Sequence, residues 1–265
     1  MVMSVRVRLS RIVIALLVFA MPAMARGARS GPHLDVAAAA DLKFAMDELV
    51  SAFGKARSDI MVSVSYGSSG NFLSQIQNGA PFDLFFSADI EYPRRLAEAG
   101  LAAKGSEFRY AVGRIVVWVP AASRVPVERG VQALIAPEVR RIAIANPRHA
   151  PYGRAAEAAL RKLGVYDAVK DKLVFGENVA QTAQFVQSGA ADAGIIALSL
   201  AIAPALAKEG RYYEVPLDAY PRMDQGGIVL DRARDPGAAG AFRDFVLGSE
   251  GRAALKRYGF FLPGE

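Results

Sequence analysis

Residues 60–77 read IMVSVSYGSSGNFLSQIQ, in which an alternating run passes through two serines and two glycines into a short apolar-periodic segment. The first part predicts a strand over 60–65 and the last part a helix over 72–77. A turn before a helix exposes unpaired N–H groups that hold an anion without a basic side chain, and glycine lets a ligand approach the backbone closely. An ordinary polar loop with a serine cap has the same pattern, so the turn alone does not distinguish the two interpretations.

The rest of the chain repeats this alternation of strand and helix. Expected strands cover residues 34–39, 60–65, 83–86, 141–145, 173–175, 193–197 and 228–230, and residues 110–119 form a long β-rich segment. Expected helices cover residues 42–56, 72–77, 92–99, 153–163 and 180–187, and two more follow residue 238. Repeated βα units predict an α/β fold with parallel, doubly wound sheets. Two groups of such units around the long β-rich segment 110–119 indicate two lobes joined by strands.

The first 25 residues are typical of a cleavable secretory signal peptide. A basic start is followed by an apolar run over 12–20 and a small-x-small end at Ala25. This run is shorter than the ~18 residues that a membrane span needs, which argues against the alternative of a signal anchor. The chain contains no cysteine, so a lipid anchor, disulfides and thiol chemistry are excluded.

Composition limits the classes of partner. The formal charge is +6, and removal of three signal-peptide arginines leaves a value near +3. Basic residues alternate with acidic ones and form no stripe interleaved with aromatic residues, so a nucleic-acid partner is not expected. A modest positive field favours small anions. About 240 mature residues are enough for a large core in one or two domains.

Four loops connect an expected strand to the next helix. They cover residues 37–41, 67–70, 146–153 and 176–180, two in each half of the chain. Ligands of open α/β sheets bind beyond the carboxyl ends of the strands. We therefore expect the four loops to present N–H groups to one cleft between the lobes.

Several motifs resemble the ModA-like molybdate-binding proteins of ABC importers. They are AAAADL at 37–42, YGSSG at 66–70, NGAPFDLFFSAD at 78–89, ANP at 145–147, APYG at 150–153, GENV at 176–179 and RYGF at 257–260. The motifs follow in order over nearly the whole mature chain. The segment 78–89 is the specific one, whereas the serine turn alone is not.

The resemblance implies a type II periplasmic binding protein with two α/β lobes, each a mostly parallel sheet flanked by helices, hinged by crossing strands. Lobe I would comprise residues 33–113 and 222–265, and lobe II residues 114–221. Such a protein is periplasmic, is not an enzyme and needs no cofactor. It captures molybdate, and here also tungstate, and delivers it to a membrane permease; a monomer is expected.

The resemblance also implies the ligand-binding residues. They are Ala40, Asp41, Ser69, Tyr152 and Val179, with Ala40 and Val179 acting through the backbone and Tyr152 through its phenol. Residues expected to support them are Ser68, Gly70, Asn178 and Pro151. These groups would bind the oxygen atoms of the anion, and no site for a bare cation is expected.

Asp41 departs from the family pattern, in which Ser or Asn is common at this position. A carboxylate ~4 Å from a unit charge costs about 4 kcal/mol at an effective dielectric near 20, and a dianion roughly doubles that. Micromolar binding supplies only about 8 kcal/mol. Asp41 could cap the helix that follows, be protonated, or accept a proton from hydrogen phosphate or arsenate. Capping is the favoured interpretation, and it predicts nearly constant affinity between pH 6 and pH 8.

Other functions remain as alternatives. A different tetrahedral oxyanion, such as sulfate, phosphate, arsenate or chromate, fits the same donors. An exported hydrolase could use Ser69 with His149, but the Gly-x-Ser-x-Gly elbow is absent. The effector-sensing domain of a regulator would share the fold, yet the signal peptide and the lack of a helix-turn-helix segment argue against it. His33 and His149, the only histidines, make a poor metal site, and Asp83 and Asp89 are expected to be structural.

Overall fold

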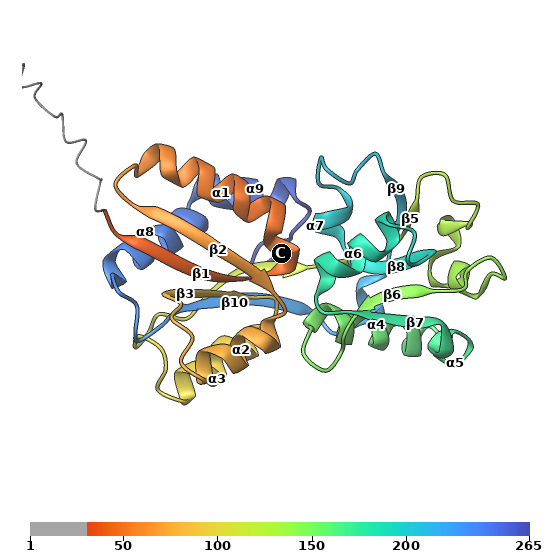
Figure 1. The fold of residues 1–265 in the computed structure, drawn as a ribbon, viewed down its shortest axis with the longest axis horizontal. Helices are drawn as coiled ribbons and strands as arrows, with labels where there is room; N and C mark the ends of the chain where they lie inside the picture. Colours follow the sequence, from red (N-terminus) through yellow and green to blue (C-terminus); the bar gives the residue numbers. More distant parts are fainter. Residues whose placement is uncertain (1–30) are drawn as a thin grey trace, which may run out of the picture. The chain divides into compact units, whose positions relative to one another are not determined.

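The computed structural model describes residues 31–265, so the expected signal peptide lies outside the described part. Within it, the chain forms two five-stranded sheets, each covered by helices on both faces (Figure 1). We call the first sheet with its helices lobe I and the second lobe II. The α/β fold with two lobes is therefore confirmed.

Lobe I has the strand order β2-β1-β3-β10-β4. Its strands are β1 (His33–Ala39), β2 (Met61–Gly67), β3 (Leu84–Ser87), β4 (Phe108–Gly113) and β10 (Met223–Val229). β1 runs parallel to β2 and β3, whereas β10 is antiparallel to β3 and β4. Helices α1 (Lys43–Ala56), α8 (Pro236–Leu247) and α9 (Ser249–Arg257) cover one face, and α2 (Ser69–Gln77) and α3 (Glu91–Glu98) the other (Figure 1).

Lobe II has the strand order β7-β6-β8-β5-β9. Its strands are β5 (Ile115–Pro120), β6 (Ile142–Ala145), β7 (Leu173–Gly176), β8 (Ala193–Ala197) and β9 (Gly210–Glu214). β6 is parallel to β7 and β8, and β5 is antiparallel to β8 and β9. Its helices are α4 (Pro151–Lys162), α5 (Tyr166–Val169), α6 (Val179–Gln187) and α7 (Leu198–Ala201). Four 3-10 segments, η1 (Ala40–Leu42), η2 (Val127–Ile135), η3 (Lys170–Lys172) and η4 (Leu217–Ala219), complete the described elements.

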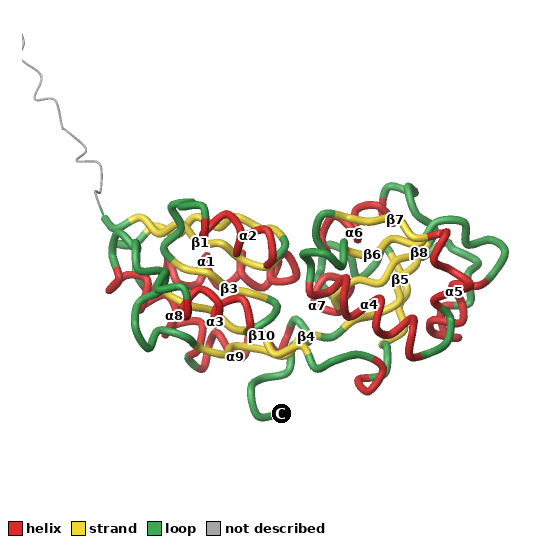
Figure 2. The backbone as a smooth tube through the Cα atoms, turned by 90° about the horizontal axis from the view of Figure 1, so that it is seen from below, coloured by secondary structure: helices red, strands yellow, loops and turns green. Residues whose placement is uncertain are grey.

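The β-rich segment 110–119, within which the lobe boundary was expected between residues 113 and 114, forms two strands. The segment divides at Arg114 into β4 and β5, which belong to different sheets, and here the chain crosses between the lobes (Figure 2). The Arg114 guanidinium donates to the Gly259 carbonyl at 2.8 and 2.9 Å and to Glu214 at 2.9 Å. Both halves are apolar and buried, so the pattern of hydropathy carries no sign of the division.

Three of the helices that follow the predicted binding loops begin earlier than predicted. α2 begins at Ser69, α4 at Pro151 and α6 at Val179, whereas the sequence pattern placed their starts one to three residues later. Residues expected in loops therefore occupy first helical turns, where N–H groups have no intrahelical acceptor. Proline is well suited to the first position because it has no N–H to leave unpaired.

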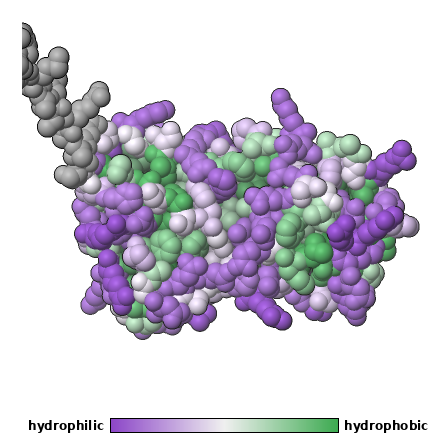
Figure 3. Space-filling view, in the orientation of Figure 1, coloured by the Kyte–Doolittle hydropathy of each residue, from purple (hydrophilic) through white to green (hydrophobic). Residues whose placement is uncertain are grey.

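Each lobe has its own apolar core. The short central strands β3, β6 and β8 are buried along their whole length. In lobe I, edge-to-face aromatic contacts join Phe53, Phe86 and Phe242, with ring centroids 5.1 to 6.1 Å apart. The visible face in Figure 3 is largely hydrophilic, with apolar patches interrupted by polar residues. Among residues 31–265, no helix combines the length and apolar character that crossing a membrane requires.

Candidate functional site

The four predicted loops meet around one small cavity between the lobes. Its volume is about 10 Å³, far below the several hundred Å³ of a pocket for a drug-sized molecule. The lining residues are Ala39, Ala40, Asp41, Gly67, Ser68, Ser69 and Ala88 from lobe I, and Ala150, Pro151, Tyr152, Asn178 and Val179 from lobe II. All the predicted site residues except Gly70 therefore line it. Asp41 is the only lining residue with a charged side chain, and no Lys, Arg or His is present.

Backbone N–H groups from both lobes are available at this cavity. The N–H groups of Ala40 and Ser69 in lobe I, and of Tyr152 and Val179 in lobe II, make no hydrogen bond within residues 31–265. All four lie at the start of a helical segment, where the helix dipole places partial positive charge. A compact anion in the cavity would satisfy them without contacting a cation.

The Ser69 hydroxyl adds a fifth neutral donor. Ser69 is buried, and its Oγ accepts the N–H of Ala88 at 3.0 Å. Since this bond uses a lone pair of the oxygen, the hydroxyl hydrogen remains available. Ser69 is therefore oriented by the loop after β3 while retaining its ability to donate.

Ser68 and Gly70 serve the contact between the lobes. Ser68 occupies the N-cap position of α2 but makes no capping bond. Its Oγ lies 2.8 Å from His149 Nδ1 in lobe II, and the N–H of Gly70 donates to the His149 carbonyl at 2.9 Å. A Cβ at Gly70 would lie 2.5 Å from that carbonyl oxygen, so only glycine permits this approach. Asn71 also bonds Glu177 of lobe II, and these contacts hold the lobes in a closed arrangement.

The capping interpretation of Asp41 is wrong. Its side chain makes no capping bond to η1 or α1. Instead Oδ2 accepts hydrogen bonds from the Tyr152 hydroxyl at 2.9 Å and from Gln225 Nε2 at 2.7 Å. The backbone carbonyl of Asp41 accepts from Ser199 Oγ of α7 at 2.7 Å. Tertiary partners on two other elements outweigh the local backbone donors that a cap would use.

Burial controls the ionisation of Asp41. The side chain is 1 % exposed, and burial raises its pKa from 3.8 to about 6. Hydrogen bonds from Gln225, Tyr152 and its own N–H lower the pKa without cancelling the effect of burial. Its Oδ1 is buried and has no hydrogen-bond partner within residues 31–265. Asp41 thus lies at the cavity as a carboxyl group that changes charge near neutral pH.

Tyr152 lines the cavity, but its phenol already has an acceptor. The hydroxyl donates its one hydrogen to Asp41, and burial followed by the Asp41 charge raises the pKa of Tyr152 well above its usual value. The phenol is therefore always protonated. In this closed arrangement the open donor of Tyr152 is its backbone N–H.

Gln225 of β10 was missed by the sequence analysis. It is fully buried and also lies 3.1 Å from the Tyr152 hydroxyl. Gly113 makes room for this cluster, because a Cβ there would lie 2.5 Å from the Tyr152 oxygen. The predicted strand began only at residue 228, so Gln225 fell outside every expected element. A buried amide in a strand leaves no periodic signal that could have identified it.

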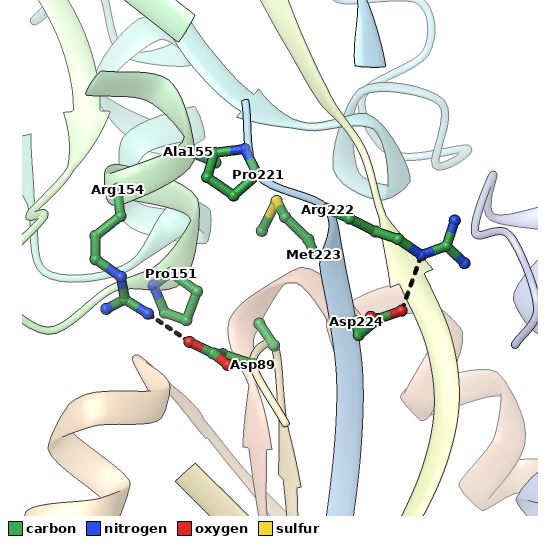
Figure 4. Close-up of a pocket in the computed structure, with 9 residues that line it drawn as sticks. Asp89, Pro151, Arg154, Ala155, Pro221, Arg222, Met223 and Asp224 are labelled. Atoms are coloured by element: carbon green, nitrogen blue, oxygen red, sulfur yellow. Dashed lines mark hydrogen bonds and ion pairs between the residues drawn. The ribbon is translucent and has the colours of Figure 1, made fainter. Parts of the chain in front are cut away.

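A larger cavity of about 260 Å³ adjoins the first and shares Ala88 and Pro151 with it. Figure 4 shows Arg154 of α4 directed at Asp89 of lobe I, with N–O separation 2.6 Å, while Arg222 turns toward Asp224 at 3.0 Å. Arg154 also donates to the Tyr92 hydroxyl at 2.7 Å. Both guanidinium groups are paired, so the charges of this cavity are already matched. No group of three or more potential cation ligands occurs in the described range.

The two lobes and the small cavity between them, lined by neutral donors, define a binding protein for a small solute. The chain belongs to the bacterial extracellular solute-binding protein family, whose model matches residues 34–261. It is 37 % identical to the molybdate-binding protein ModA of Azotobacter vinelandii, over 96 % of this chain and 98 % of that protein. It is also 37 % identical to the molybdate-binding protein ModA of Rhodobacter capsulatus, over 75 % of this chain and 77 % of that protein.

The solved structure of the Azotobacter vinelandii periplasmic molybdate-binding protein has the same fold. The TM-score is 0.82 at 33 % sequence identity, covering 87 % of this chain and 99 % of that one. Family and fold thus agree with the architecture described above.

Proposed function

We propose that this chain captures molybdate, and also tungstate, in the cavity between the lobes and delivers it to the permease of an ABC importer. It acts in the periplasm as a monomer after cleavage of the signal peptide, without a lipid anchor. It needs no cofactor, and it makes or breaks no bond. The similarity to two molybdate-binding proteins supports the choice of ligand.

The observation that carries this proposal is the set of neutral donors around a compact cavity. Four N–H groups and the Ser69 hydroxyl surround a space too small for a larger organic solute. Donors come from both lobes, so bound anion stabilises the closed arrangement over an open one. The permease then recognises the closed form.

Selectivity among tetrahedral anions depends on size. Molybdate and sulfate have the same shape and charge but differ in size, and the spacing of the donors in the closed arrangement decides which size fits. Calorimetry of the protein with molybdate, tungstate, sulfate and phosphate tests this directly. We expect molybdate and tungstate to bind tightest. Tighter binding of sulfate or phosphate would assign the site to another oxyanion.

Ser69→Ala tests the hydroxyl donor. It should weaken molybdate binding by about 1–3 kcal/mol, because one donor is lost from a buried site. Ser106→Ala is the matched control: Ser106 is also buried, but its hydroxyl bonds Ala103 and Val229 within lobe I. Equal affinity of both variants would mean that the Ser69 hydroxyl does not bind the anion.

The hydrolase alternative finds its histidine contact at Ser68 rather than Ser69. His149 Nε2 lies 3.6 Å from Glu177, whose side chain is 54 % exposed. This separation is too long for the hydrogen bond that orients a catalytic histidine. We expect no labelling by serine-reactive phosphonates, checked by intact mass, and stoichiometric labelling of Ser68 would favour the enzyme.

A further inference from the structure

Asp41 presents a chemical conflict that the proposed function leaves open. It lines the cavity, and its own carboxylate would repel the anion that the surrounding N–H groups attract. No basic side chain compensates, because the lining contains none. A carboxylate and a dianion therefore cannot share this site without a further change in charge.

The groups around Asp41 are all neutral or acidic. Tyr152 of α4 and Gln225 of β10 donate to Oδ2, and the hydroxyl of Ser199 on α7 reaches only the backbone carbonyl. Tyr110 of β4 is the other titratable group close enough to interact, and the Asp41 charge raises its pKa further above the effect of burial. Lys43 on the same segment is directed to Asp47, at 3.1 Å. Nothing here stabilises a negative charge by a positive one.

The hydrogen bonds identify the oxygen that is left for a proton. Oδ2 already accepts two hydrogen bonds, as the carbonyl oxygen of a neutral carboxylic acid can. Oδ1 is buried and makes no hydrogen bond within residues 31–265. An acceptor that is buried without a donor is costly, whereas the same atom carrying a proton becomes a donor.

We propose that anion binding is coupled to the uptake of one proton by Asp41, carried on Oδ1, so that the carboxylate that repels the anion becomes a neutral donor to it. This inference rests on the proposed function, since it concerns the oxyanion site. The protein groups contact the oxygen atoms of the anion and none ligates its metal. With serine or asparagine at position 41, anion affinity would not depend on pH. With aspartate there, the affinity depends on pH.

The energetics of Asp41 support this coupling. Burial raises its pKa to about 6 in the absence of any ligand, so the protonated form is accessible near neutral pH. A dianion nearby disfavours the carboxylate further and raises the pKa again. Between the pKa of the free protein and that of the complex, linkage requires affinity to fall by about tenfold per pH unit.

The test is calorimetry of molybdate binding from pH 5.5 to pH 8.5, with buffers of different ionisation enthalpy to count protons. We expect the wild-type protein to take up close to one proton per anion at pH 7.5 and to lose about tenfold in affinity per unit above pH 6. Asp41→Asn should bind with an affinity that changes less than about threefold over the range, and without proton uptake. The control Asp167→Asn makes the same charge change at an exposed side chain in α5 and should behave as the wild type does.

The outcomes separate this inference from the proposed function. Tight, pH-independent binding by the wild type overturns the proton coupling and leaves molybdate capture intact. Equal pH dependence in the wild type and Asp41→Asn overturns it also, because the proton then belongs to another group. If the wild type and both variants bind none of the four oxyanions at any pH, the proposed function fails and the coupling fails with it.

Discussion

Lobe I holds two carboxylates whose side chains are equally inaccessible to solvent, at opposite ends of its sheet, and gives them opposite pKa shifts. Asp41 and Asp83 are each 1 % exposed. Asp41 follows the carboxyl end of β1, next to the cavity, while Asp83 precedes the amino end of β3 on the far side. Burial raises the pKa of Asp41 to about 6. At Asp83 burial also raises the pKa, but hydrogen bonds from Arg234 and backbone N–H groups outweigh it and hold the pKa below its usual value.

The difference lies in the partners. Arg234 lies 2.6 Å from Asp83, which also accepts the N–H groups of Asp35 at 2.7 Å and Arg234 at 2.8 Å. Asp41 has only neutral donors, which are Tyr152, Gln225 and its own N–H. Asp83 also lies nearer the surface, beside the half-exposed Arg234, so it is desolvated less than Asp41. The weaker desolvation and the adjacent cation together keep Asp83 an anion, whereas Asp41 titrates. A structural carboxylate and one suited to a binding site are thus distinguished by their neighbours as well as by their depth.

The largest stability change is expected from Asp41→Asn. A folded-state pKa of about 6 lies above the unfolded value of 3.8, so ionisation costs stability once the pH rises through this interval. The neutral variant should therefore be more stable by about 3 kcal/mol at pH 8, and no more stable at pH 4. Urea unfolding at both pH values measures this. An equal gain in stability at pH 8 and pH 4 would mean that the charge of Asp41 is not the cause.

Arg234→Ala should destabilise the protein, whereas Asp41→Asn should stabilise it. It leaves Asp83 buried with backbone donors only, and we expect a loss of about 2 kcal/mol at pH 7, less than for a fully buried pair because Arg234 is half exposed. Asp83 has a lowered pKa, so its contribution is present above the unfolded value and disappears as the pH falls below about 4.

Lys43→Ala is the control for this loss. Lys43 forms a solvent-exposed ion pair with Asp47, and the two side chains are 44 % and 51 % exposed. Its removal should lower the free energy of unfolding by less than about 0.5 kcal/mol. Urea unfolding of both variants at pH 7 and pH 3.5 decides the point. If Arg234→Ala is still destabilised at pH 3.5, the lost stability comes from packing and not from the ion pair.

Tyr152→Phe should separate two roles of the phenol. Removal of a donor worth about 1 kcal/mol disfavours the Asp41 carboxylate and raises its pKa further. Molybdate affinity at pH 8 should then increase several-fold, with little change at pH 6. If the phenol donates to the anion instead, as the sequence analysis implied, affinity should fall at both pH values. Calorimetry distinguishes the two results by sign.

A small effect on binding is expected from Ser68→Ala, which removes no hydrogen-bond partner of either carboxylate. It removes the 2.8 Å contact to His149 and so weakens the closed arrangement by less than about 1 kcal/mol. Affinity should fall by no more than about fivefold, and the pH dependence should match that of the wild type. A change in the pH profile would mean that the contact between Ser68 and His149 contributes to the proton coupling.

Most helices and strands, and nearly all the residues that line the cavity, could be predicted from the sequence. Short apolar strands and amphipathic helices leave strong periodic signals, so β1, β3, β6 and β8 were found close to their observed bounds. The edge strand β9 and residues 223–227 of β10 were missed. β10 contains Gln225 and two glycines, so it has no alternating pattern that reveals it.

By itself, the sequence determined the order of βα units and the four turns before helices, because these depend on local patterning and on backbone groups that every helix start leaves open. It also placed an acidic residue at the site. Only the tertiary structure decided what that residue does. The Asp41 side chain bonds Tyr152 of α4 and Gln225 of β10 instead of capping the next helix. These partners lie 111 and 184 residues away in the sequence, so local patterning could not reveal them. Ionisation follows the burial and the charges around a group, and these exist only once distant segments have packed together.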